Sequence, residues 1–148
     1  ISANRPDSVQ LAGWPVKDDF VPKFGSDADA VHESFVKILA VRDVVTKALE
    51  EARANKVINK SQEAKVIVSA PKDTLDLLKG FDEDVYCELF IVSCVEFASA
   101  DELGCVVEVA QGEKCPRCWN ITELVKTGNH AGVCKRCADV LHEIGFVE

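Results

Sequence analysis

Two cysteine pairs in the last third of the chain constrain its fold more than any other feature. Cys115 and Cys118 form the first pair, Cys134 and Cys137 form the second, and fifteen residues separate the pairs. Two C-x2-C pairs at this separation are typical of zinc sites with four cysteine ligands. Each pair can make a tight turn that directs two sulfurs at one ion, and two such turns complete a tetrahedron of thiolates. The sequence therefore predicts one structural Zn²⁺ bound by these four residues.

The same ligand set argues against chemistry at the metal. A catalytic zinc keeps an open coordination position, whereas four cysteines close it, and this also leaves no place for His130, the only histidine between the pairs. The chain contains no Ser-His-Asp pattern, no phosphate-binding glycine loop and no paired carboxylates with an evident task. The fragment alone is therefore predicted to be non-catalytic.

Three further cysteines, Cys87, Cys94 and Cys105, lie among apolar residues. We expect them to be buried, reduced thiols, because free cysteine behaves as a small core residue. A disulfide between two of them and a reactive thiol are the alternatives. The zinc-type spacing itself favours a reducing cytosol, and hence a cytoplasmic protein.

Charge limits how the chain could meet nucleic acid. The formal net charge is −8, but residues 112–137 carry five lysine and arginine residues against two glutamates, a formal charge of +3 that leaves −11 elsewhere. Four thiolates and one Zn²⁺ would reduce the local value to about +1. Any contact with nucleic acid should therefore be local, without a broad basic surface.

Hydrophobic periodicity predicts an α+β fold, with a long helix packed on a small, mostly antiparallel sheet. The apolar stripe of the long helix should include Val31, Phe35 and Ile38, with Arg42 interrupting it. The predicted parts are an irregular lead-in, an α+β domain and a four-cysteine zinc module: residues 1–27, 28–110 and 111–148. Within them we expect helices at 27–56, 73–79, 83–89 and 138–144 and strands at 64–69, 90–97 and 105–109.

No stretch has the roughly 18 uncharged apolar residues that a membrane helix needs, so no membrane partner is expected. The chain begins with Ile1 and contains no methionine, which indicates a fragment or a processed product.

Trp119, directly after the first cysteine pair, is a candidate for RNA contact. An exposed indole can stack on an unpaired base, while Arg117, Lys135 and Arg136 could hold phosphates. The alternatives are that Trp119 shields the metal site and that the basic residues are solvated surface charges.

Several stretches together resemble the carboxyl-terminal end of bacterial-type isoleucyl-tRNA synthetases. They are Ser8–Pro15 (SVQLAGWP), Arg42–Arg53 (RDVVTKALEEAR), Ile58–Val66 (INKSQEAKV), Ile91–Ser93 (IVS), Gly112–Trp119 (GEKCPRCW) and Cys134–Cys137 (CKRC). Two residues depart from the pattern: Asn59 stands where the family usually has glycine, and Gln62 where it usually has leucine.

The resemblance implies a class I ligase that joins isoleucine to its tRNA through an aminoacyl-adenylate. Binding of ATP and Mg²⁺ would belong to a catalytic domain that lies upstream in the same chain with the editing domain, since neither the H-I-G-H nor the K-M-S-K-S signature occurs here. In such a cytoplasmic, monomeric enzyme, this region would help to hold the anticodon end of the isoleucine tRNA. Cys115, Cys118, Cys134 and Cys137 would bind zinc, with Trp119, Arg117 and Arg136 as candidate tRNA contacts.

Two other readings stay open. Formamidopyrimidine-type DNA glycosylases end in a zinc finger with similar cysteine pairs, although this reading does not account for Ser8–Pro15 or the long acidic helix. Alternatively, the module could be a structural unit that docks protein domains, which the net negative charge favours.

Overall fold

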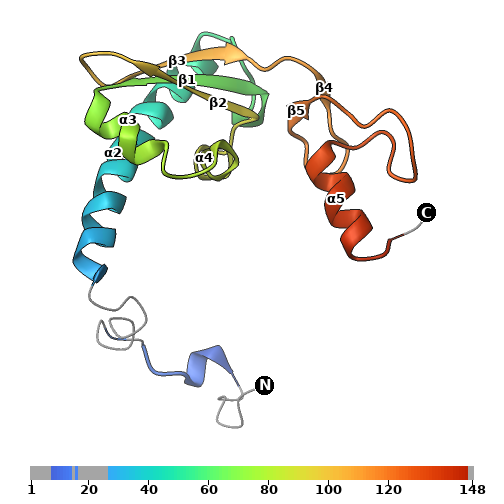
Figure 1. The fold of residues 1–148 in the computed structure, drawn as a ribbon, viewed down its shortest axis with the longest axis horizontal. Coiled ribbons are helices and arrows are strands. Elements are labelled where there is room, and N and C mark those ends of the chain that lie inside the picture. The colour runs from blue at the N-terminus through green and yellow to red at the C-terminus, as the bar shows by residue number, and fades with distance from the viewer. Residues whose placement is uncertain (1–7, 15, 17–26, 147–148) are drawn as a thin grey trace. The chain divides into compact units, whose positions relative to one another are not determined.

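The computed structural model describes residues 8–14, 16 and 27–146, and the chain divides into two compact units, residues 1–36 and 37–148 (Figure 1). Most of the predicted lead-in, residues 1–27, lies outside the described residues. Its described part contains one short 3-10 helix, η1 (Val9–Leu11). The predicted boundary between residues 110 and 111 stays a prediction. Below, residues 37–110 are called the body and residues 111–146 the zinc module.

The predicted long helix is α2 (Ala28–Ala54). Its buried residues recur every three or four positions, at Ile38, Val41, Val45, Leu49 and Ala52, which places them on one face. Val41 fills the position where we expected Arg42 to interrupt the stripe, and Arg42 lies beside it with Nε donating to the Leu89 carbonyl at 3.4 Å. The stripe prediction was wrong for Val31 and Phe35, which are exposed.

The sheet has three strands in the order β2-β1-β3. They are β1 (Ala64–Ala70), β2 (Cys94–Ser99) and β3 (Gly104–Val109). β3 pairs antiparallel with β1, Val107 opposite Val66, whereas β2 pairs parallel with β1, Val95 opposite Val66. The sheet is therefore mixed, a departure from the mostly antiparallel expectation.

The crossover between β1 and β2 explains the parallel pair. It contains two short helices, α3 (Lys72–Leu78) and α4 (Glu83–Phe90). A connection of this length carries the chain back to the starting edge of the sheet, as parallel strands require. Phe90, expected at the start of a strand, instead ends α4, and Ile91 follows it in a left-handed conformation (φ 59°) that stops the helix.

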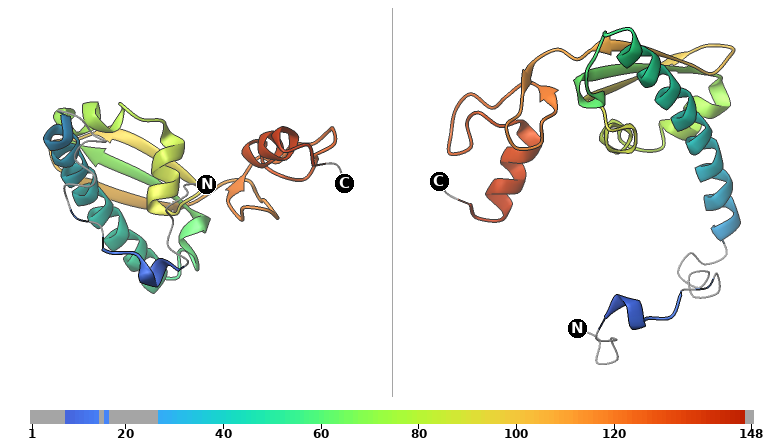
Figure 2. Two further views of the ribbon diagram at one scale, coloured as in Figure 1. Left: turned by 90° about the horizontal axis from the view of Figure 1, so that it is seen from below. Right: turned by 180° about the vertical axis from the view of Figure 1, so that it is seen from behind.

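The core of the body lies between the sheet and its helices, which cover one face (Figures 1 and 2). Alternate residues of β1, from Ala64 to Ala70, are buried, the period of two expected for a strand with one face in the core. Tyr86 of α4 is buried among them, and its hydroxyl donates to the Leu78 carbonyl at 2.9 Å. These elements confirm the α+β class.

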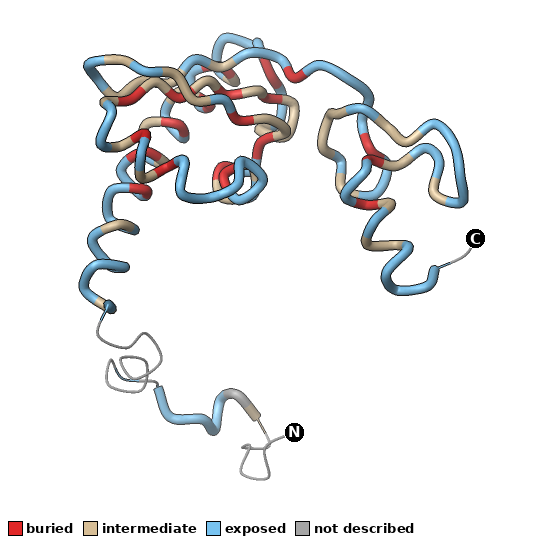
Figure 3. Tube along the Cα trace, in the orientation of Figure 1, coloured by how far each residue is buried: buried red, intermediate tan, exposed pale blue. Residues whose placement is uncertain are grey.

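The zinc module contains little regular structure. After β3, the module has two strands of two residues each, β4 (Glu113–Lys114) and β5 (Ile121–Thr122), and one helix, α5 (Lys135–Glu143). The 3-10 turn η4 (Ser61–Glu63) belongs to the body, where it precedes β1. Figure 3 shows few buried positions in this part of the chain. Within the part of the chain that the structure describes, no helix is long and apolar enough to span a membrane.

Candidate metal centre

The first cysteine pair lies in the turn that joins β4 to β5. The Trp119 N–H donates to the Cys115 carbonyl at 2.8 Å, and the Cys115 N–H donates to the Asn120 carbonyl at 2.9 Å. Trp119 itself adopts a left-handed conformation with φ 69°. Gly112 permits the hairpin to close for two reasons. Its φ of 124° is one that other residues rarely adopt, and a Cβ at this position would lie 2.7 Å from the Thr122 backbone.

The second pair is built into the start of α5. Cys134 is the N-cap residue and Cys137 lies in the first turn, where the Ala138 N–H donates to the Cys134 carbonyl at 2.9 Å. The amino-terminal end of a helix carries partial positive charge, which suits the negative charge of a metal–thiolate centre. A single antiparallel bridge between Leu124 and Cys134 holds this pair against the intervening loop.

The two turns bring all four sulfurs together. The Sγ atoms of Cys115, Cys118, Cys134 and Cys137 lie within 4.8 Å of one another, and those of Cys118 and Cys134 are 3.7 Å apart. Four sulfurs bound to one ion at about 2.3 Å in a tetrahedron would be about 3.8 Å apart. The arrangement fits Zn²⁺, and the group includes no histidine or carboxylate that would make it a catalytic type of site.

Local donors support a thiolate at Cys115, whereas burial raises the pKa of Cys118 and of Cys134 until a metal binds. Burial disfavours the thiolate of Cys115, but backbone N–H groups of residues 118, 134 and 117 outweigh it and lower the pKa of Cys115 to about 6. The Cys134 N–H lies 3.4 Å from the Cys115 Sγ, and the Arg117 Nη1 donates to the Cys137 Sγ at 3.5 Å. Arg117 thus places a positive charge beside a centre whose net charge, with four thiolates and Zn²⁺, is −2.

The other three cysteines lie in a different environment. Cys87, Cys94 and Cys105 are free and half-buried in the body, consistent with the expected reduced thiols. Burial raises the pKa of Cys87 and of Cys105 to about 11, and it also raises the pKa of Cys94. These thiols stay protonated at neutral pH, so they lack the thiolate character that metal binding and nucleophilic attack require.

Trp119 does not cover the metal centre. Its side chain is 56% exposed, and it is not part of the apolar cluster around the cysteines, which consists of the ligands with Leu124 and Val133. The Lys114 Nζ lies 5.6 Å from the centre of its ring. Trp119 lines a groove of about 190 Å³, here called the Trp119 groove, whose lining is Lys60, Gln62, Glu63, Val109, Lys114, Trp119 and Ile121.

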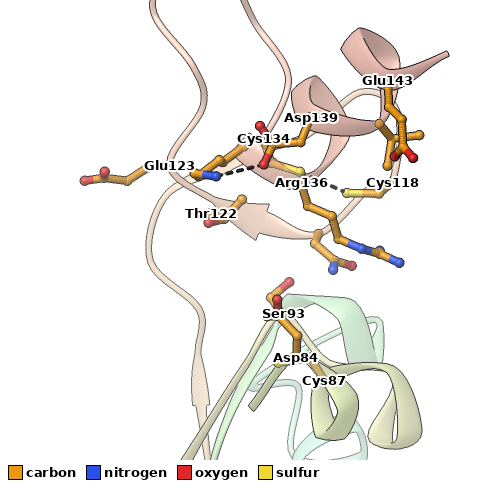
Figure 4. Close-up of a pocket in the computed structure, with 13 residues that line it drawn as sticks. Asp84, Cys87, Ser93, Cys118, Thr122, Glu123, Cys134, Arg136, Asp139 and Glu143 are labelled. Carbon is orange, nitrogen blue, oxygen red and sulfur yellow. Dashed lines mark hydrogen bonds and ion pairs between the residues drawn. The ribbon is translucent and has the colours of Figure 1, made fainter. Parts of the chain in front are cut away.

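Lys135 and Arg136 lie elsewhere, on a wider cleft of about 520 Å³ (Figure 4). The Lys135 Nζ is 2.8 Å from an Asp139 carboxylate oxygen, and Arg136 pairs with Glu88 of α4. The cleft also presents the carboxylates of Asp84, Glu123, Asp139 and Glu143. The structure therefore brings the four cysteines together but does not group Trp119 with Lys135 and Arg136, because the two clefts share no lining residue.

Sequence reasoning missed the residues that join the zinc module to the body. The Ser93 Oγ donates to the Gln62 carbonyl at 2.5 Å and accepts from the Ile121 N–H at 2.7 Å, while the Gln62 Nε2 donates to the Cys118 carbonyl at 3.3 Å. The only signal in the sequence was that Gln62 departs from the pattern of the resemblance, where leucine is usual. A leucine could not make the contact with Cys118.

Asn59 is the other residue that departs from the pattern of the resemblance, and the structure shows its contacts. Its N–H and side-chain amide both donate to the Glu63 carboxylate, at 2.8 and 3.4 Å. These bonds lower the pKa of Glu63 and close the turn before β1, so the turn forms without glycine.

Comparison with known proteins agrees with this geometry. A family profile described as "Zinc finger found in FPG and IleRS" matches residues 112–140, the segment that contains the four clustered cysteines. Together with the sulfur geometry, this match identifies one structural Zn²⁺ site, as the cysteine spacing predicted.

Curated relatives extend the similarity to most of the chain. The isoleucine–tRNA ligase of Natranaerobius thermophilus is 34% identical over 95% of this chain and 16% of its own length. Those of Thermotoga petrophila and Staphylococcus carnosus are both 40% identical, over 90% and 95% of this chain, and each is covered over 15% of its length. The chain thus spans about a sixth of the curated relatives it matches. Over 90–95% of its length it is similar to a short segment of isoleucine–tRNA ligases, and this segment includes the zinc finger.

Proposed function

We propose that this chain is the carboxyl-terminal part of an isoleucine–tRNA ligase, where it helps to bind the anticodon end of the isoleucine tRNA. The printed names of the relatives and the small share of each that is covered support this reading. ATP, Mg²⁺ and isoleucine would be bound by upstream domains of the same polypeptide, in a cytoplasmic, monomeric enzyme. This segment contributes no catalytic group, and its zinc maintains the shape of the module.

The exposure of Trp119 is the observation that carries the RNA-binding role. Trp119 is an exposed residue, and burial of its large apolar ring against a partner would be favourable. The backbone of Trp119 is left-handed, a conformation that a bulky residue adopts rarely. An exposed aromatic ring is what an unpaired base needs for stacking.

The charges around the groove suit a nucleotide better than those of the wider cleft. Lys60 and Lys114 line the Trp119 groove with one carboxylate, Glu63, and that carboxylate already accepts bonds from the Asn59 and Lys60 N–H groups. A phosphate next to the stacked base would therefore meet two ammonium groups. We add Lys60 and Lys114 to the candidate contacts.

Arg117, Lys135 and Arg136 remain candidates with different requirements. Arg117 is exposed, and its Nη1 donates a hydrogen bond to the Sγ of Cys137. It would therefore have to bind a phosphate while it keeps this bond to the metal ligand. Lys135 and Arg136 are held by exposed carboxylates, and such surface pairs contribute roughly 0–1 kcal/mol, so a phosphate could replace the partner. We rank them below Trp119 for this reason.

Substitution of Trp119 tests the proposal in the complete ligase. Trp119→Ala should raise the KM for isoleucine tRNA by about tenfold or more, because stacking on an aromatic side chain is worth roughly 1–3 kcal/mol per base. Isoleucine-dependent exchange of pyrophosphate with ATP, which needs no tRNA, should not change. Trp119→Phe, which keeps an aromatic face, should retain most of the tRNA affinity.

An unchanged KM and kcat for tRNA in Trp119→Ala would instead favour a module that only docks protein domains. The contacts between the body and the zinc module are the observation that favours this second function. The glycosylase reading has less support, because the similarity to ligases covers residues far upstream of the shared zinc finger.

A further inference from the structure

The body and the zinc module have no apolar core in common. The buried residues of the body form one cluster, from Ile38 in α2 to Val95 in β2, and those of the module form another around Cys115, Cys134 and Cys137. Packing of side chains therefore does not set the orientation of the module. Polar contacts between the two parts, together with the connecting chain after β3, must do so.

Ser93 is the centre of these contacts. It stands directly before β2, and its hydroxyl bonds to one group on each side: it donates to the Gln62 carbonyl of the body and accepts from the Ile121 N–H of the module. A serine hydroxyl has one hydrogen to donate and lone pairs to accept, so both bonds form at once. Both groups would lose this partner if the hydroxyl were removed.

Gln62 makes the second connection. Its side-chain amide donates to the carbonyl of Cys118, and the peptide bond that carries this carbonyl leads directly into Trp119. The other end of the same peptide, the Trp119 N–H, is fixed by the Cys115 carbonyl. Gln62 thus contacts the one peptide group that links a zinc ligand to the proposed stacking residue.

The Trp119 groove crosses the junction between the two parts. Lys60, Gln62, Glu63 and Val109 of the body form one wall, and Lys114, Trp119 and Ile121 of the module form the other. Gln62 and Ile121, which take part in the bonds just described, are both lining residues. The relative position of the walls therefore depends on the same contacts.

We propose that Gln62 and Ser93 are positioning residues: by bonding to Cys118 and Ile121 they fix the zinc module on the body and hold the two walls of the Trp119 groove at the separation that a stacked nucleotide requires. The inference rests on the proposed function, since it assigns these residues to the binding of tRNA. Neither residue need touch the RNA. Their effect is exerted through Trp119 on one wall and the lysines on both.

The ion pair between Arg136 and Glu88 also joins the two parts, and it provides a matched comparison. Both side chains are exposed, so the pair should contribute little to the orientation of the module. Glu88→Ala removes that contact without touching the Trp119 groove. It should leave the KM for tRNA within about twofold of the parent value.

The test compares Ser93→Ala, Ser93→Thr and Gln62→Leu in the complete ligase. Zinc content, hydrogen exchange of the Ile121 amide and the tRNA KM and kcat would be measured for each, with Trp119→Ala in the same series. Ser93→Ala should keep one zinc per chain, expose the Ile121 amide to faster exchange and raise the tRNA KM about fivefold, the effect of one lost neutral hydrogen bond. kcat and the isoleucine KM should not change.

Two variants separate positioning from simple loss of folding. Ser93→Thr keeps a hydroxyl and should restore much of the Ile121 protection and the tRNA KM. Gln62→Leu keeps the approximate size of the side chain and both backbone groups, so it should leave Ile121 protected while raising the tRNA KM about threefold, since only the bond to Cys118 is lost.

The possible results distinguish failure of the positioning role from failure of the proposed function. If Trp119→Ala raises the tRNA KM but Ser93→Ala and Gln62→Leu do not, the positioning role is overturned and the proposed function stands. If Trp119→Ala has no effect on the tRNA KM, the proposed function fails, and the positioning role fails with it. If Ser93→Ala leaves the exchange of the Ile121 amide unchanged, the hydroxyl is not the connection, and the inference is overturned whatever the kinetics show.

Discussion

The body and the zinc module differ in what their buried side chains are. In the body, valine, leucine and tyrosine side chains from helices and strands are buried together. In the module, the buried residues are Cys115, Cys134 and Cys137, and apolar support comes from Leu124 and Val133, which are only partly buried. α5 adds little, because Ile144, directly after it, is 65% exposed. One region is held by apolar burial, and the other has almost none.

This difference teaches where the folding free energy of each region comes from. Burial of apolar surface contributes roughly 25 cal/mol per Å², so the body can fold from its own composition. The module cannot, and binding of a structural zinc, worth about 10–16 kcal/mol in small zinc-finger peptides at neutral pH, must supply most of its stability. The two regions should therefore respond independently to changes in metal and in core packing.

Loss of one ligand should produce the largest effect. Cys118→Ser removes a thiolate and leaves an incomplete tetrahedron, so the module should unfold and bound zinc should fall to well below one per chain. The body should keep its helical circular dichroism, since its core does not include the cysteines of the site. Cys94→Ser, a half-buried thiol of the body, is the matched control and should retain the metal. Loss of the body's structure in Cys118→Ser would break the comparison.

A substitution in the core of the body should have a smaller and complementary effect. Leu78 is fully buried at the end of α3, so Leu78→Ala should lower the free energy of unfolding of the body by about 3 kcal/mol, measured by denaturant titration. Zinc content at equilibrium should stay at one per chain. A parallel loss of metal would mean that the module depends on the body for its fold.

Sequence alone predicted the metal site well because the site is local. Each cysteine pair lies within one turn, and spacing alone determines whether two sulfurs can reach one ion. The α+β class also followed from local periodicity, which located α2 and β1 to within a few residues. These predictions needed no knowledge of which elements become neighbours.

Several features that the sequence did not predict depend on long-range contacts. The parallel pairing of β1 with β2 depends on the crossover between them, and the bonds of Ser93 join residues 31 and 28 positions apart. The ion pair of Arg136 was likewise not predicted, because nothing in the sequence places Glu88 beside the second cysteine pair. Such contacts follow from tertiary packing, which periodicity does not encode.

Hydrogen exchange with and without zinc tests the central claim most directly. The reduced chain would be compared before and after removal of the metal by a chelator, following amides of the module such as Val125 and Ala138 and amides of β1 such as Val66. We predict that module amides lose protection while β1 amides keep it, and that adding zinc restores the original pattern. Module amides that stay protected without metal, or β1 amides that lose protection with them, would contradict the account.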